Sequence, residues 1–210
     1  MPSREFPFLK RGLVAILRGL RPDEAVAMAE AIYEAGIEAI EVPLNSPEPL
    51  LSIERIRKAL PQTALVGAGT VLTPEAVDEV FNAGGELMVS PNIDPAVMER
   101  AAFHGMVTMP GVFSPTEALL AVRLGASALK FFPANVLGTA GISGIRAVLP
   151  AETKIGAVGG VAEQDFAAYR AAGAQLFGLG SSLFKPGLVV AEVARRSSSV
   201  VAAWDALSDD

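Results

Sequence analysis

Cysteine is absent from this chain of 210 residues, and histidine occurs once, as His104. Without thiols the protein has no disulfide, no thiolate metal ligand and no cysteine nucleophile. With one imidazole, a zinc site would need mainly carboxylate ligands, and a serine–histidine relay would depend on a residue followed by the turn-forming Gly105. We therefore expect chemistry that uses neither a metal ion nor a catalytic triad.

Positive charge is also scarce. The chain carries 17 basic and 23 acidic residues, which gives a net charge of -6. Such a surface repels nucleic acid and anionic lipid, so we expect a small-molecule partner and neither nucleic acid nor a membrane. The segment 1–11 holds four charged residues and no apolar run of signal-peptide length, and no later stretch is typical of a membrane span. These features predict a cytoplasmic protein.

Helix stops recur along the chain at intervals of 20 to 25 residues, each just before an apolar segment. The stops are Gly36, Pro61, Gly84, Gly105, Gly125, Pro150 and Gly173. Glycine after a helix adopts the left-handed conformation that ends it, and proline there prevents another turn. Each interval accommodates one strand, one helix and short loops, so the chain is interpreted as a repeated βα unit.

Seven such joints predict eight strands and a (β/α)8 TIM barrel that occupies residues 1–210 as one domain. We expect strands at 13–17, 39–44, 64–67, 87–89, 107–109, 128–132, 154–158 and 176–179, and a closing helix near 189–204. With 51% hydrophobic residues the chain is long enough to fill such a core. An open doubly wound sheet is the alternative, although its edge strands would not need eight such regular units.

The active sites of α/β barrels lie at the carboxyl ends of the strands, so polar residues that end apolar runs are the candidates. Lys130 interrupts such a run, and strand alternation places it on one face with Ala128 and Phe132. Burial inside the barrel would lower the pKa of the amine and make it a Schiff-base nucleophile. Alternatively, the lysine extends to water or pairs with an interior carboxylate. The other lysines lie in termini, helix ends or loops: Lys10, Lys58, Lys154 and Lys185.

Three further polar residues lie in or just after predicted strands. Glu41 shares its face with Ala39, so an inward carboxylate that exchanges protons near Lys130 is expected, with a structural ion pair as the alternative. Arg18 ends the first strand, where its guanidinium could hold a substrate carboxylate, although strand-end arginines are often surface residues. Thr70 follows small residues, and its hydroxyl could assist Arg18.

Glycine-rich loops follow the last two strands. Gly159, Gly160 and Val161 precede an acidic helix, and the run from Gly178 to Ser182 includes Gly180 and Ser181. Barrels commonly bind phosphate at this position through backbone amides and a short helix N-terminus. We therefore expect a phosphorylated ligand.

Across nearly its whole length the sequence resembles the bacterial 2-keto-3-deoxy-6-phosphogluconate and 2-keto-3-deoxy-6-phosphogalactonate aldolases. The motifs that carry the resemblance are AILRG (15–19), IEVPLNSP (40–47), VGAGTVL (66–72), SPN (90–92), MPG (109–111), LKFFPA (129–134) and VGGV (158–161). The resemblance implies a (β/α)8 barrel and metal-independent, cofactor-free Schiff-base chemistry on a pyruvate unit. It also implies a homotrimer.

Within this resemblance, site residues are assigned position by position. Lys130 looks like the Schiff-base lysine and Glu41 like the general acid/base, while Arg18 and Thr70 look like carboxylate contacts. The family's phosphate site is matched by four residues here: Gly160, Val161, Gly180 and Ser181. Phe132 and Pro133, together with Pro91 and Pro110, would shape the pocket.

Two positions favour the galactonate type over the gluconate type. Gluconate-type enzymes tend to carry Arg-Thr where this chain has Asn45 and Ser46, and a threonine where it has Val158. Valine cannot hydrogen-bond a substrate hydroxyl, so Val158 is a candidate for reading the C4 configuration. We therefore predict cleavage of 2-dehydro-3-deoxy-6-phosphogalactonate to pyruvate and glyceraldehyde 3-phosphate.

Four alternatives remain. The gluconate epimer or 4-hydroxy-2-oxoglutarate could be the substrate of an aldolase with relaxed specificity. A phosphosugar isomerase on the same barrel would not need an imine at Lys130. A non-catalytic sugar-phosphate sensor would bind without cleavage.

Overall fold

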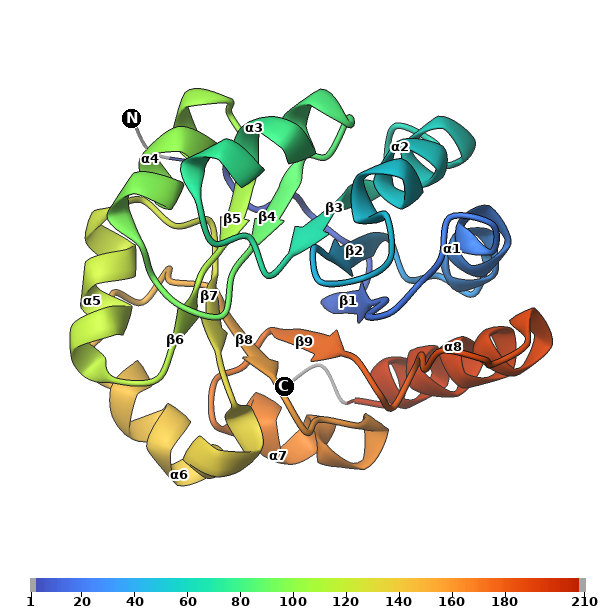
Figure 1. Cartoon of the computed structure of the whole chain (residues 1–210). Helices are drawn as coiled ribbons and strands as arrows, with labels where there is room; N and C mark the ends of the chain where they lie inside the picture. The colour runs from blue at the N-terminus through green and yellow to red at the C-terminus, as the bar shows by residue number, and fades with distance from the viewer. Residues whose placement is uncertain (1–2, 208–210) are drawn as a thin grey trace.

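The computed structural model describes residues 3–207, in which parallel strands form an inner barrel and helices form an outer ring (Figure 1). The strands are β1 (Leu13–Ile16), β2 (Ala39–Pro43), β3 (Leu65–Gly69), β4 (Leu87–Val89), β5 (Val107–Met109), β6 (Gly111–Val112), β7 (Leu129–Phe131), β8 (Ile155–Val158) and β9 (Leu176–Leu179). The helices are α1 (Ala25–Glu34), α2 (Pro49–Ala59), α3 (Pro74–Asn82), α4 (Pro95–Phe103), α5 (Pro115–Arg123), α6 (Ala134–Arg146), α7 (Phe166–Ala171) and α8 (Val190–Asp205), with a 3-10 turn at Glu163–Asp165.

The predicted barrel is confirmed, with one strand broken in two. All neighbouring strands pair in parallel, in the order β5-β4-β3-β2-β1-β9-β8-β7-β6. Strands β5 and β6 are consecutive, separated by Pro110 alone, so the two ends of this order are one stretch of chain. The Lys130 N–H donates to the Pro110 carbonyl at 2.9 Å across the break. The sheet therefore closes with eight strand positions, and the ninth strand arises because proline offers no N–H to the ladder.

Alternating side chains divide the core into two layers, as the sequence predicts. The inner layer fills the barrel and includes Val14, Ala39 and Ala128, with Phe132 packed against it. The outer layer lies between strands and helices and includes Ile40, Val42, Leu129 and Phe131. Successive strand residues point to opposite faces, so Glu41 and Lys130 belong to the inner side.

The amino end of the barrel is covered by the first residues of the chain. The Arg4 N–H donates to the Met106 carbonyl at 3.2 Å, and the Lys154 ammonium donates to the Phe6 carbonyl at 3.1 Å. Phe6 itself is buried against the inner layer. In Figure 1 the dark-blue start of the chain crosses from the side of α4 to β1. Because this end is covered, polar chemistry inside the barrel is confined to the carboxyl ends of the strands.

Element boundaries differ from the predicted ones by one or two residues. The third strand runs to Gly69 where 67 is predicted, and β7 is shorter than 128–132 at both ends. The closing helix is Val190–Asp205 where 189–204 is predicted. Helices α3, α4 and α5 each begin with proline after a capping Thr73, Asp94 or Ser114, whose side chains accept backbone N–H groups. Along residues 3–207, every helix is too short or too polar to cross a membrane.

Candidate active site

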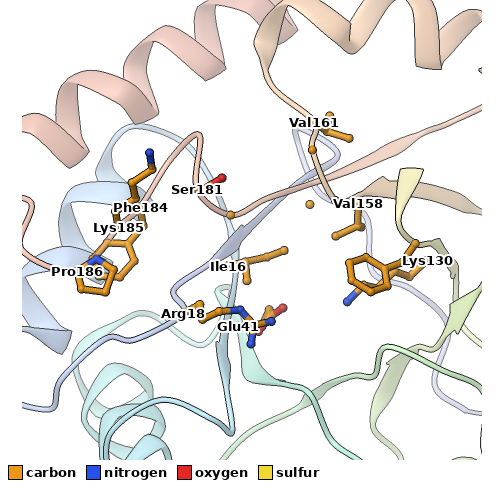
Figure 2. Close-up of a pocket in the computed structure, with 15 residues that line it drawn as sticks. Ile16, Arg18, Glu41, Lys130, Val158, Val161, Ser181, Phe184, Lys185 and Pro186 are labelled. Atoms are coloured by element: carbon orange, nitrogen blue, oxygen red, sulfur yellow. The ribbon is translucent and has the colours of Figure 1, made fainter. Parts of the chain in front are cut away.

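A cavity of about 320 Å³ opens at the carboxyl ends of the strands (Figure 2). It is the place where the strand pattern predicts the chemistry. Ten of the predicted site residues line it: Arg18, Glu41, Lys130, Phe132, Val158, Gly159, Gly160, Val161, Gly180 and Ser181. The structure therefore gathers residues from β1, β2, β7, β8 and β9 and their following loops around one space.

Lys130 comes from the middle of β7 and is 6% exposed. Burial lowers the pKa of its amine; the charge of Glu41 acts against that shift, and the charge of Arg18 adds to it. The ammonium lies 4.7 Å from the centroid of the Phe132 ring, so an aromatic face covers part of it. An amine in these surroundings is more often neutral at physiological pH than a lysine in water, as a nucleophile requires.

Glu41 comes from β2 and is 2% exposed. Burial raises the pKa of its carboxyl to about 7, against the charges of Lys130 and Arg18, which lower it. Among residues 3–207, no group donates a hydrogen bond to its Oε2. In Figure 2 the carboxyl lies beside the Arg18 side chain, with Lys130 across the cavity. A carboxyl with this pKa gives and takes protons near neutral pH.

Arg18 follows β1 and extends from an exposed loop to the cavity. Its Nη1 donates to the Asn45 Oδ1 at 2.6 Å, and the neighbouring Gly19 N–H donates to the Ser46 hydroxyl at 2.9 Å. Both acceptors belong to the loop that follows β2. Asn45 therefore acts on the cavity through Arg18, and the remaining guanidinium N–H groups are available to an anion.

Five of the predicted site residues do not line the cavity: Asn45, Thr70, Pro91, Pro110 and Pro133. Thr70 follows β3 with a φ of 58°, a left-handed conformation that is unusual for a β-branched residue. No hydrogen bond joins it to Arg18 within residues 3–207. Pro110 occupies the strand break, and Pro133 lies just before α6. Their expected roles remain predictions.

The two glycine-rich loops form one end of the cavity. Gly159 and Gly160 have φ values of 94° and 68°, which side chains rarely allow. The Ser182 hydroxyl donates to the Val161 carbonyl at 3.1 Å and so joins the two loops. Within residues 3–207, the N–H groups of Gly160, Val161 and Ser181 donate no hydrogen bond. Unpaired N–H groups around a hollow are suited to a phosphate.

Five further residues line the cavity: Ile16, Gly178, Phe184, Lys185 and Pro186. Gly178 begins the glycine-rich run at the last strand, and the other four were not predicted to belong to the site. Strand alternation would have placed Ile16 on the inner face. The three residues of the loop after β9 had no comparable signal, because the path of that loop depends on packing against the loop after β1. A Cβ added to Gly19 would lie 2.6 Å from the Pro186 Cγ.

Together these groups can perform carbonyl chemistry. A buried amine faces a buried carboxyl, a guanidinium lies beside that carboxyl, and an amide-lined hollow lies at the loops after β8 and β9. Within the described part of the chain, no three histidine, aspartate or glutamate side chains form a group that could hold a metal ion. The chemistry that the residues themselves support is addition of the amine to a carbonyl, with proton transfer by the carboxyl.

Comparisons with known proteins agree with this geometry. The family model of KDPG and KHG aldolase matches residues 8–203. A Rhizobium meliloti (strain 1021) protein named probable 2-dehydro-3-deoxy-6-phosphogalactonate aldolase is 57% identical over 96% of this chain and 95% of its own. The 2-dehydro-3-deoxy-6-phosphogalactonate aldolase of Escherichia coli (strain K12) is 44% identical over 93% of this chain and 95% of its own. A solved structure described as native KDPGal superposes with a TM-score of 0.93. It is 43% identical, and the match covers 96% of this chain and 97% of that one.

Proposed function

The chain belongs to the KDPG and KHG aldolase family, and on that premise we propose that it cleaves 2-dehydro-3-deoxy-6-phosphogalactonate to pyruvate and glyceraldehyde 3-phosphate. The observation that carries the proposal is the pairing of Lys130 with Glu41 in one cavity. Burial lowers the pKa of the amine and raises that of the carboxyl to about 7. The relatives named for the galactonate substrate support the choice of donor.

The reaction begins at Lys130. Its neutral amine adds to the C2 ketone of the substrate and gives a carbinolamine, which loses water to become a protonated imine. The lowered pKa of Lys130 increases the fraction of neutral amine that can make this attack. The Phe132 ring, at 4.7 Å from the ammonium, limits the water around it.

Glu41 moves the protons. It takes the C4 hydroxyl proton, directly or through one water, as the C3–C4 bond breaks and the bonding electrons pass to the imine. The aldehyde, glyceraldehyde 3-phosphate, leaves, and an enamine remains on Lys130. Protonation of that enamine at C3 and hydrolysis of the imine release pyruvate and restore the amine. A carboxyl with a pKa of about 7 suits both directions of transfer.

The two ends of the substrate carry the charges that orient it. Arg18 would hold the C1 carboxylate through paired N–H groups, in a position supported by its bond to Asn45. The phosphate would occupy the hollow formed by the N–H groups of Gly160, Val161 and Ser181. Lys130 lines the same cavity, so a substrate held at both ends would present its ketone to the amine.

Val158 is proposed to read the C4 configuration. It ends β8, is buried, and lines the cavity beside Gly178, where an added Cβ would lie 2.7 Å from Val158 Cγ2. An apolar wall at this place offers no hydrogen bond to a hydroxyl that points toward it. We propose that this disfavours the gluconate epimer without excluding it.

The proposal extends to assembly and location. We propose a homotrimer, as the family resemblance implies. That the chain forms an oligomer is supported by the likeness to a cage designed from symmetric oligomeric domains, which is 44% identical, covers 93% of this chain and 73% of that chain, and has a TM-score of 0.91. Sedimentation equilibrium would test the trimer: a mass of three protomers is expected, and a mass of any other number of protomers would contradict it. A cytoplasmic location is supported by the substrate class, because a charged phosphate ester is costly to transfer from water into lipid.

The test is pyruvate release from the two C4-epimeric phosphorylated keto acids. The expected result is release from the galactonate epimer with a higher kcat/KM than from the gluconate epimer. Both Lys130→Met and Glu41→Gln should lower kcat by at least a hundredfold. Comparable rates for both epimers would make the protein an aldolase of relaxed specificity. Binding without pyruvate release would contradict the proposed function.

A further inference from the structure

Lys185 brings a third cation to the cavity, and the proposed mechanism leaves it without a role. It is exposed at the rim and lines the cavity together with Ser181 and Gly180. In Figure 2 its amine points upward, away from Arg18; Ser181 also lies above Arg18 in this view. Within residues 3–207, the ammonium makes no hydrogen bond or ion pair. It is therefore available to an anion in the cavity.

The backbone that carries Lys185 is held in place on both sides. Before it, the N–H of the buried Phe184 donates to the Gly180 carbonyl at 2.9 Å. After it, Pro186 packs against Gly19, where an added Cβ would lie 2.6 Å from the proline Cγ. The Lys185 carbonyl itself accepts the Leu188 N–H at 3.2 Å. A long flexible side chain thus starts from a fixed point at the rim.

The charges of the proposed substrate explain why a third cation is needed. A phosphate ester carries about -1.5 to -2 charges at pH 7, in addition to the C1 carboxylate. Arg18 is assigned to the carboxylate, and Lys130 becomes the imine. The N–H groups of Gly160, Val161 and Ser181 are neutral dipoles. Among the described residues that line the cavity, Lys185 is the remaining cation.

We propose that Lys185 pairs with the substrate's phosphate and makes the enzyme selective for phosphorylated over unphosphorylated keto acids. This inference rests on the proposed function for its substrate. The ammonium closes over the phosphate from the rim, while the backbone N–H groups hold it from below. The pairing acts on binding, so it appears mainly in KM, and it is screened by salt because the side chain is exposed.

Four proteins and two substrates test the proposal: wild type, Lys185→Met, Lys185→Arg and the control Lys58→Met, each with the phosphorylated keto acid and its unphosphorylated counterpart. Lys58 lies on α2, where it pairs with Glu54 outside the cavity, so its loss removes the same charge elsewhere. Lys185→Met should lower the ratio of the two kcat/KM values about tenfold, chiefly through KM. Lys185→Arg should keep the ratio within about threefold, and Lys58→Met should leave it unchanged.

If Lys185→Met leaves the ratio unchanged, whether or not both kcat/KM values fall, the proposal is overturned. A second measurement separates this failure from failure of the proposed function. In an equilibrium titration with inorganic phosphate, which needs no turnover, Lys185→Met should bind about tenfold more weakly than wild type. Equal affinities would overturn the pairing even if pyruvate release proceeds as proposed. A wild type that binds phosphate through Lys185 but releases no pyruvate would overturn the proposed function alone.

Discussion

The carboxyl of Glu41 lies directly against Gly69: a Cβ added to this glycine would be 2.1 Å from Oε2 and 2.5 Å from Oε1. Gly69 ends β3, and its register partner in β2 is Pro43, two residues after Glu41 on the same face. Because Gly69 has no side chain, the carboxyl of Glu41 can occupy this space inside the barrel. The size of one residue on β3 controls the position of the proposed acid/base on β2.

Gly69→Ala should therefore displace Glu41 and lower kcat by tenfold or more, through a misplaced proton acceptor. The matched control is Gly144→Ala on α6, where an added Cβ meets nothing within 4 Å. It should leave kcat unchanged and the protein as stable or slightly more stable, because alanine favours a helix. Steady-state kinetics and thermal melts of both variants check this, and full activity in Gly69→Ala would contradict it.

The stability of the protein should fall as pH rises through the titration of Glu41. Burial raises its carboxyl pKa from 4.5 to about 7. Between these values the unfolded chain releases the proton and the folded chain keeps it. The stabilisation is complete below pH 4.5 and lost by about pH 7, up to about 3 kcal/mol.

Glu41→Gln removes this dependence, so its melting temperature relative to wild type should rise between pH 4.5 and 7. Glu192→Gln serves as the control. Arg195 and Arg196 hold the pKa of Glu192 down at about 2, so its contribution is lost only as pH falls below 4.5. If the melting temperature of Glu41→Gln differs from that of wild type by the same amount at pH 5 and at pH 7, the pKa of Glu41 is not raised.

Val158→Thr should shift specificity toward the gluconate epimer. The substitution keeps the shape of the side chain and adds one hydroxyl to the cavity wall at the end of β8. We expect the ratio of kcat/KM for gluconate over galactonate epimer to rise about threefold to tenfold, the worth of one hydrogen bond. Val161→Thr introduces the same hydroxyl in the loop after β8 and should not change the ratio. An equal change of this ratio in both variants would contradict a specific role of Val158 in epimer selection.

Arg18→Lys should weaken binding of the C1 carboxylate. Lysine replaces a planar fork with a point charge and loses the bond from Arg18 to Asn45. We expect KM to rise about tenfold while kcat changes less. The control Arg21→Lys alters a neighbouring exposed arginine that pairs with Asp23. Competitive inhibition by pyruvate reports the same contact, so unchanged inhibition in Arg18→Lys would contradict the assignment.

Much of the fold and the centre of the site could be predicted because local rules govern short buried strands. Alternation around Lys130 and Glu41 assigns inner and outer faces, and the inner and outer core layers agree. The break at Pro110 was not predicted, although proline in a strand is itself a signal of interrupted pairing. In these places each residue's neighbours in sequence determine its surroundings.

The rim of the cavity could not be predicted in the same way. Lys185 and Pro186 reach it because their loop packs against Gly19, which precedes them by more than 160 residues. Thr70 was expected to assist Arg18, yet it has a left-handed backbone just after Gly69 and does not line the cavity. Contacts between loops depend on the closed barrel, and no local pattern encodes them.

The most direct test of the account is to trap the imine. Wild-type protein is incubated with pyruvate, reduced with borohydride and mapped by peptide mass spectrometry. The account predicts a reduced pyruvate adduct on Lys130, none in Lys130→Met, and no adduct on Lys185. Absence of an adduct in wild type, or an adduct on another lysine, would contradict Schiff-base catalysis at Lys130.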